Sequence, residues 1–213
     1  MPRVVVAETR RQDVAQAVLR IVGREGLESA SLRNVAQEAG LAIGSVRHYF
    51  ASQTELMIFT MEELRRRIDG RIRSHAEQLL DPGASIDRRT RTEELFAEFL
   101  PLDETRREEA VLWLAFITAA RTRPEFRPCA RRMYEEAREL IARVLHEAQR
   151  SGGVPGDLDI ALETQRLAAL LDGLTLGGVL HPDQVAPDAA RAILHRHLRT
   201  LVDPDQGRAT GHP

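Results

Sequence analysis

The stretch SLRNVAQEAGLAIGSVRHYF, residues 31–50, contains two short segments whose apolar residues recur at helical spacing. Gly40 separates the two segments, and glycine readily adopts the left-handed turn that a side chain resists. Two helices that cross over a short glycine-containing turn form a helix-turn-helix, whose second helix enters the major groove of DNA. A helix of about two turns is not stable alone in water. The pair therefore needs a neighbouring helix to bury it, and the apolar stripe from Val14 to Val22 supplies that surface.

The rest of the sequence continues the helical pattern. No useful length alternates with the period of two that a half-buried strand requires. Gly26 is expected to end the first helix, and Ser52 with Glu55 forms a capping box that opens the fourth. We predict an all-α fold of nine helices. The expected helices run up to Gly26 and over 32–39, 43–49, 52–80, about 85–100, 104–122, 125–151, 157–180 and 187–202.

The predicted organisation has three parts. Residues 1–51 form the helix-turn-helix domain, and the helix over 52–80 connects it to a larger C-terminal domain that covers 52–203. Residues 204–213 contain nothing that could form a core, so this tail is expected to be disordered.

Composition limits the class of protein. The 213 residues carry a net charge of −2 and one cysteine, Cys129, which cannot form an internal disulfide and suits a reducing compartment. No apolar run approaches the ~18 residues of a membrane helix, and the first apolar patch is too short for a signal peptide. We expect a cytoplasmic globular protein. The charge through Phe50 is mildly positive, which is compatible with phosphate contacts at that end.

The residues expected to contact DNA lie on the outer surface of the two short helices and at the start of the next. Arginine pairs with guanine edges, an aliphatic group suits a thymine methyl, and hydroxyl or imidazole groups donate to phosphates. A serine at a helix N-terminus also forms a phosphate site. These predicted DNA-binding residues are Ser31, Arg33, Ile43, Gly44, Ser45, Arg47, His48, Tyr49, Gln53 and Thr54.

Aromatic residues are few, and most fall in the middle helices. They either pack in the core or line a cavity for a mostly apolar small molecule, and the sequence leaves both interpretations open. Asp172 lies in an apolar helix, where its carboxyl group must find a partner or be protonated. Its partner would be the end of a neighbouring helix or a ligand. The candidate ligand-binding residues are Phe96, Phe99, Trp113, Phe116, Phe126, Met133, Tyr134 and Asp172.

Enzyme chemistry finds little support in the sequence. His195 and His197 are two residues apart, which places them on different faces of a helix and disfavours a metal pair. Cys129 has no neighbouring histidine, and no glycine-rich phosphate loop follows a strand. We predict no catalytic residues, no metal and no cofactor.

The segment SLRNVAQEAGLAIGSVRHYFASQTELM closely resembles the DNA-binding segment of TetR-family transcriptional regulators, over about residues 8–68. The remainder resembles the BetI-type C-terminal domain of that family in LWLAF at 112–116, RTRPEF at 121–126 and LLDGLTLG at 170–177. The resemblance implies an all-helical homodimeric repressor whose C-terminal domain binds a small molecule that releases the DNA. Two positions depart from the family: Ala42-Ile43 replaces serine and a polar residue, and Gln53 replaces a lysine that binds phosphate.

The same resemblance implies that the last two long helices form the dimer interface, although both could instead cap the core of a monomer. Gly173 and Gly177 lie one turn apart and would allow another helix to approach closely. The predicted interface residues are Leu170, Leu171, Gly173, Leu174, Gly177, Ile193, Leu194 and Leu198.

The predicted function is a ligand-responsive homodimeric repressor that binds an inverted-repeat operator. Its expected partners are double-stranded DNA, a second copy of the chain and a mostly apolar effector. The alternatives are an all-helical small-molecule-binding protein or enzyme with a vestigial helix-turn-helix, an activator, and a repressor without a ligand.

Overall fold

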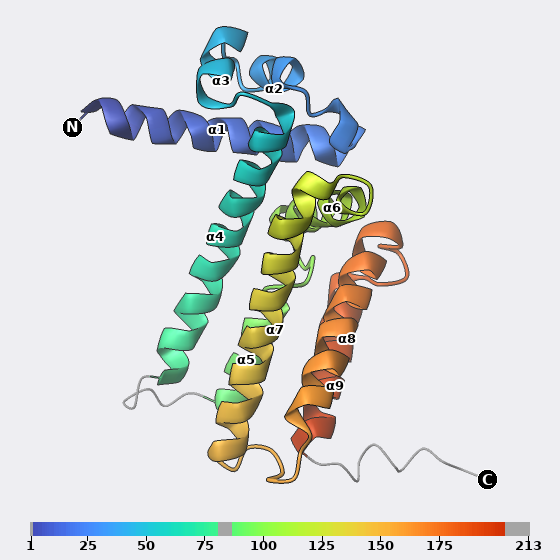
Figure 1. The fold of residues 1–213 in the computed structure, drawn as a ribbon. Coiled ribbons are helices and arrows are strands. Elements are labelled where there is room, and N and C mark those ends of the chain that lie inside the picture. Colours follow the sequence, from blue (N-terminus) through green and yellow to red (C-terminus); the bar gives the residue numbers. More distant parts are fainter. Residues whose placement is uncertain (1, 81–86, 203–213) are drawn as a thin grey trace. The chain divides into compact units, whose positions relative to one another are not determined.

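The computed structural model describes residues 2–80 and 87–202, which form helices and connecting turns with no strand among them (Figure 1). The predicted all-α fold with nine helices is confirmed over these residues. Two short 3-10 turns, η1 and η2, add to the α-helices. In chain order the elements are α1 (Pro2–Glu25), η1 (Leu27–Ser29), α2 (Leu32–Glu38), α3 (Ile43–Tyr49), α4 (Gln53–Leu80), α5 (Arg88–Ala97), α6 (Glu104–Ala120), η2 (Pro124–Phe126), α7 (Arg127–Arg150), α8 (Ile160–Leu180) and α9 (Pro187–Val202). Over the described residues, no helix is long and apolar enough to cross a membrane.

Helix ends differ from the prediction at several positions, since α5 ends at Ala97, α6 ends at Ala120 and α7 begins at Arg127. At two helix starts the reason is a side chain that caps the backbone. Helix α5 begins at Arg88 rather than near residue 85, because the Asp87 carboxylate accepts a hydrogen bond from the backbone N–H of Arg89 at 3.0 Å. Helix α8 begins at Ile160 because Asp159 caps it in the same way. The predicted stop at residues 81–83 and the tail over 204–213 lie outside the described residues.

Two glycines end helices as expected. Gly26 has a φ of 84° and Gly40 a φ of 65°, which is the left-handed region that other residues rarely adopt. The capping box at the start of α4 is also present, with a one-residue difference. The Ser52 hydroxyl accepts from the N–H of Glu55 at 3.1 Å, but the Glu55 carboxylate accepts from Ala51 at 2.8 Å rather than from Ser52.

The described helices form two compact units. The first contains the chain up to Asp69 together with Glu108–Arg132, and the second contains Gly70–Arg107 and the residues from Met133 onward. The predicted domain boundary at residue 51 does not coincide with this division. The first half of α4 and the α6–α7 corner pack with the N-terminal helices, so they belong to the same compact unit.

Ion pairs connect the α6–α7 corner to the N-terminal helices within the first unit. One Arg123 guanidinium nitrogen donates to both carboxylate oxygens of Glu28, at 2.7 and 2.5 Å. Arg132 at the start of α7 pairs with Glu62 of α4. These contacts join residues that are 95 and 70 positions apart in the sequence.

In the second unit, α8 packs closely against the connection between α5 and α6. A Cβ atom added at Gly178 would lie 2.7 Å from Cγ of Pro101, and one added at Gly177 would lie 2.9 Å from a methyl group of Val185. The Thr175 hydroxyl donates to the carbonyl of Phe99 at 3.1 Å. Gly177 and Gly178 therefore serve close packing within the chain, whereas a Cβ atom added at Gly173 would meet nothing within 4 Å.

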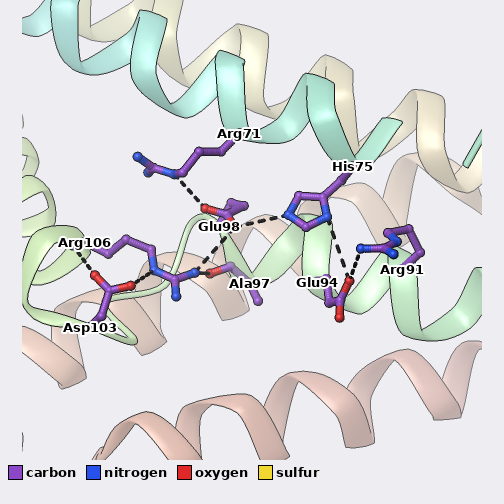
Figure 2. A network of polar contacts seen from close by, with 8 residues as sticks. All are labelled: Arg71, His75, Arg91, Glu94, Ala97, Glu98, Asp103 and Arg106. Carbon is purple, nitrogen blue, oxygen red and sulfur yellow. Dashed lines mark hydrogen bonds and ion pairs between the residues drawn. The ribbon is translucent and has the colours of Figure 1, made fainter. Parts of the chain in front are cut away.

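A network of charged side chains fixes the second half of α4 on α5 (Figure 2). The half-buried Glu98 carboxylate accepts from Nε of Arg71 at 2.7 Å and contacts Nε2 of His75 at 3.2 Å. Arg106 approaches the same carboxylate at 3.6 Å and donates to the carbonyl of Ala97 at 3.3 Å. Glu98 thus connects α4, the end of α5 and the start of α6.

Candidate nucleic-acid interface

Helix α2 is fixed at its N-terminus by local hydrogen bonds. Ser31 is the N-cap, and its hydroxyl accepts from the backbone N–H of Asn34 at 3.2 Å. The Asn34 side chain donates in turn to the carbonyl of Ser29 at 2.8 Å. Val35 and Ala36 are buried beneath the helix, so its inner side is held by the core of the first unit.

The C-terminal end of α2 is held on α1 by a double ion pair. The Glu38 carboxylate accepts from Nε of Arg20 at 2.7 Å and from Nη2 of Arg24 at 2.8 Å. Hydrogen bonds from Arg24 and then Arg20 lower the pKa of Glu38 to about 2. The carboxylate therefore remains charged at any ordinary pH and keeps α2 against α1.

The turn between α2 and α3 sets the crossing of the two helices. Gly40 takes the left-handed conformation, and the N–H of Leu41 then donates to the carbonyl of Ala36 at 2.9 Å. Helix α3 begins immediately after, with Ala42 as an N-cap that offers no side-chain hydrogen bond.

Helix α3 has a buried side and an exposed side, as the sequence predicted. Val46 and its C-cap Phe50 are 0% exposed, which anchors the helix to the core. Ile43, Gly44, Arg47 and His48 are exposed, while Ser45 and Tyr49 are half-buried. The rings of His48 and Tyr49 meet edge to face at 5.4 Å. The outer side of α3 therefore presents an aliphatic group, a guanidinium and an imidazole together.

Two predicted DNA-contacting groups already have hydrogen-bond partners within the chain. The Ser31 hydroxyl caps α2, and the Gln53 side-chain amide donates to the carbonyl of Ala30 at 3.1 Å. Both side chains support the helix-turn-helix in this conformation, and their contact with DNA stays a prediction. Arg33 is exposed on α2, and Thr54 is half-buried at the start of α4.

One residue that the sequence reasoning missed is Arg11 on α1. Its guanidinium carbon lies 4.4 Å from the ring centroid of Phe59 and 5.5 Å from that of Phe50. The available signal was its spacing: Arg11 lies three residues before Val14 and so extends the inward stripe of α1.

The candidate ligand-binding residues are divided between the two compact units. Trp113, Phe116 and Phe126 belong to the first compact unit, whereas the other candidates, Phe96, Phe99, Met133, Tyr134 and Asp172, belong to the second. Phe96, Phe116 and Phe126 are completely buried, and the rings of Phe116 and Phe126 lie 4.7 Å apart. Their full burial is what the core interpretation expects, and the ligand-binding assignment of these three phenylalanines stays a prediction.

The remaining candidates are less buried. Trp113, Phe99 and Met133 are half-buried, and Tyr134 is exposed with the guanidinium of Arg138 over its ring at 5.6 Å. Asp172 is an exposed residue, contrary to the expectation that it lies inside the packed helix. Its carboxyl group is still partly withdrawn from water, and this desolvation raises its pKa.

Some of the predicted dimer residues are buried within the chain, and others are half-buried or exposed. Leu171, Leu174 and Leu194 are buried within the single chain, so they pack in its core rather than on an open surface. Gly177 is occupied by its contact with Val185. Leu170 and Leu198 are half-buried, and Gly173 and Ile193 are exposed. The exposed apolar side chains of this region that the sequence did not single out are Leu162, Leu176 and Leu180.

A packed helix-turn-helix with an exposed second helix, attached to a larger helical body, defines a DNA-binding transcriptional regulator. Residues 16–58 match the family model of bacterial regulatory proteins of the tetR family, and residues 88–203 match the C-terminal model of BetI-type transcriptional repressors. The chain belongs to the TetR family of transcriptional regulators, with a BetI-type C-terminal domain.

Known regulators are similar to this chain over nearly its whole length. The HTH-type transcriptional regulator PksA of Bacillus subtilis is 32% identical over 206 residues, which cover 96% of each protein. A transcriptional regulator from Rhodococcus sp. Rha1 has a TM-score of 0.76 at 26% identity, covering 91% of this chain and 96% of that one. A regulator from Saccharomonospora viridis, solved in complex with choline, has the same fold at 23% identity, with a TM-score of 0.76 over 90% of this chain and 96% of that one. Membership of a family of regulators confirms the prediction that the chain is not an enzyme.

Proposed function

We propose that this chain is a homodimeric repressor that binds an inverted-repeat operator through α3 and releases it when a small molecule binds. The observation that supports DNA recognition most directly is the division of α3 into two sides. Val46 and Phe50 are fully buried, whereas Ile43, Arg47 and His48 face outward. A two-turn helix so firmly anchored, yet polar and basic outside, fits the major groove of DNA.

The chemistry of the outer side suggests the role of each residue. Among the described residues, neither Arg33 nor Arg47 forms an ion pair, and both are exposed, so both guanidinium groups are available to an acceptor on DNA. Arg47 suits the O6 and N7 atoms of guanine, and Ile43 suits a thymine methyl group. Tyr49 and Thr54 suit phosphate oxygens, which position the protein without reading sequence.

Dimer formation is supported by an apolar row on α8. Leu162, Leu176 and Leu180 recur close to whole turns of the helix, and all three are exposed in the single chain. Ile193 of α9 is exposed as well. Exposed apolar rows of this kind mark surfaces that another protein covers. A two-fold symmetric dimer would present two copies of α3 to half-sites about one helical turn apart, or a multiple of that distance.

The effector is proposed to be a mostly apolar molecule that contacts the half-buried Trp113. An aromatic side chain gives a large contact area at small entropic cost, and Trp113 is the only tryptophan in the chain. Release of DNA requires the effector to bind the DNA-incompetent state more tightly, since equal affinity for both states would shift nothing.

The proposed function is tested by sequencing the genomic DNA fragments that the purified full-length protein retains. A shared inverted repeat, bound more tightly than its scrambled version at the same salt concentration, is the expected result. A protein that retains fragments without sequence preference would favour the alternative, an all-helical small-molecule-binding protein with a vestigial helix-turn-helix. A reporter gene behind the recovered repeat separates repressor from activator, because expression rises without the protein in the first case and falls in the second.

A further inference from the structure

The guanidinium group of Arg11 lies over two aromatic rings from two other elements. Its central carbon is 4.4 Å from the centroid of Phe59 on α4 and 5.5 Å from that of Phe50 at the end of α3. The two rings also contact each other, with centroids 5.2 Å apart and an interplanar angle of 51°. We call these three residues the Arg11 stack. It joins α1, the end of α3 and α4 at one point.

The polar surroundings of Arg11 do not explain its position. Its Nε–H is buried and has no hydrogen-bond acceptor, and within the described part of the chain Arg11 forms no ion pair. A buried donor without an acceptor is unfavourable, so other contacts must offset this cost. A flat guanidinium over an aromatic ring provides such a contact, and a lysine ammonium does not reproduce its planar stacking.

The Arg11 stack acts on the end of α3 that carries the exposed basic residues. Phe50 is the C-cap of α3, is fully buried and has an extended backbone, with a φ of −136° and a ψ of 115°. Arg47 and His48 lie on the last turn before it. Helix α3 has seven residues and little stability of its own, so the contacts at its ends set its orientation. A displacement of the Phe50 ring would therefore move Arg47 and His48 directly.

We propose that Arg11 is a positioning residue for DNA recognition: it fixes Phe50 against Phe59 and thereby fixes the base-contacting turn of α3. This inference rests on the proposed function, in which α3 binds DNA. It assigns Arg11 no contact with DNA. The role is to keep the outer side of α3 in one orientation before DNA arrives, which reduces the ordering cost of specific binding.

The test compares Arg11→Gln and Arg11→Lys with Arg10→Gln, a matched control in which the neighbouring exposed arginine is changed. Titrations use the operator and a scrambled duplex, far below the unfolding temperature, at several salt concentrations. Arg11→Gln should bind the operator about 3- to 30-fold more weakly, as expected from loss of a desolvated cation–π contact. Arg11→Lys should recover only part of this loss, because its ammonium keeps the charge but not the planar stacking. The scrambled duplex should bind with nearly unchanged affinity, and the salt dependence of operator binding should stay that of the wild type.

Three results would overturn the proposal. Equal weakening on both duplexes by Arg11→Gln, with a salt slope reduced by about one and recovery in Arg11→Lys, would show a direct phosphate contact instead. Unchanged operator affinity in both variants would show that the stack has no role in recognition. A specific loss in Arg10→Gln of the same size would show that the effect does not depend on the stack.

Amide hydrogen exchange without DNA separates this proposal from the proposed function. In Arg11→Gln, exchange should become faster over residues 43–50 and remain unchanged in α8, because only the anchoring of α3 is weakened. Equal acceleration in both segments would indicate general destabilisation, and no acceleration would remove the stack as an anchor. If the wild type shows no preference for any duplex, the proposed function fails, and this exchange experiment still decides whether Arg11 anchors α3.

Discussion

Arg47 is the residue whose chemistry is most specific to the proposed recognition of DNA. We expect Arg47→Ala to weaken operator binding by about 1–3 kcal/mol, because it removes a donor pair suited to a guanine edge. Binding to a scrambled duplex should change much less. Titrations of both duplexes at one salt concentration measure the difference, with Arg73→Ala, an exposed arginine on α4, as the control. A loss of equal size on both duplexes would assign Arg47 to the phosphate backbone.

The ion pairs of Glu38 predict how the stability of the folded state depends on pH. Its pKa is lowered to about 2 by Arg24 and Arg20, so its ion pairs stabilise the folded state fully above about pH 4.5. That contribution is lost as the pH falls from about 4.5 toward 2, because the carboxylate must then be protonated. We expect Glu38→Gln to reduce the urea midpoint at pH 7 and to differ progressively less from the wild type as the pH approaches 3. A difference that grows toward low pH would contradict this assignment.

At the scale of elements, the approach of α8 to the α5–α6 connection leaves no space for a side chain. We expect Gly178→Ala to destabilise the fold by about 1–3 kcal/mol, since its Cβ would lie 2.7 Å from Cγ of Pro101. Gly70→Ala is the matched control: it lies inside α4 with open space around its Cβ and should stabilise the helix by about 0.5–1 kcal/mol. Denaturant unfolding measures whether the free energy of unfolding falls in Gly178→Ala and rises in Gly70→Ala. Similar stabilisation of both would show that α8 can move away from Pro101.

At the scale of the whole molecule, the proposed property to test is dimer formation. We expect Leu176→Arg to convert a dimer into a folded monomer, because it places a charge on the exposed apolar row of α8. Leu174→Arg serves as the contrast: Leu174 is buried within the single chain, so its variant should unfold rather than dissociate. Tyr134→Arg, at an exposed site on α7, should change neither property. Sedimentation combined with circular dichroism distinguishes these cases. A wild-type monomer at micromolar concentration would exclude the proposed dimer.

The effector is tested at the same scale through Trp113, the only tryptophan of the chain. We expect a true effector to change its fluorescence and to lower operator affinity over the same range of concentration. Trp113→Phe should blunt the response while leaving operator binding without effector near that of the wild type. Phe116→Ala is a poor probe, because it empties a fully buried site beside Phe126 and should cost about 3–5 kcal/mol of stability. An unchanged response in Trp113→Phe would place the effector elsewhere.

The sequence alone determined the elements and the outer side of the helix-turn-helix. Apolar spacing predicted the helices, Gly26 ended the first helix as expected, and Gly40 adopted the predicted left-handed turn. The two sides of α3 followed from the positions of the apolar Val46 and of the polar Arg47 and His48. These features depend on interactions within a few residues of the chain, so a local pattern is enough to predict them.

Only the tertiary structure decided which partners distant residues have. It placed Leu174 and Leu194 in the core, turned Asp172 outward, and brought Arg11 onto Phe50 and Phe59. Helical periodicity shows that a residue lies on an apolar stripe, but it does not show whether that stripe faces its own chain or a second one. That choice depends on how elements far apart in the sequence pack together, and no spacing along the chain records it.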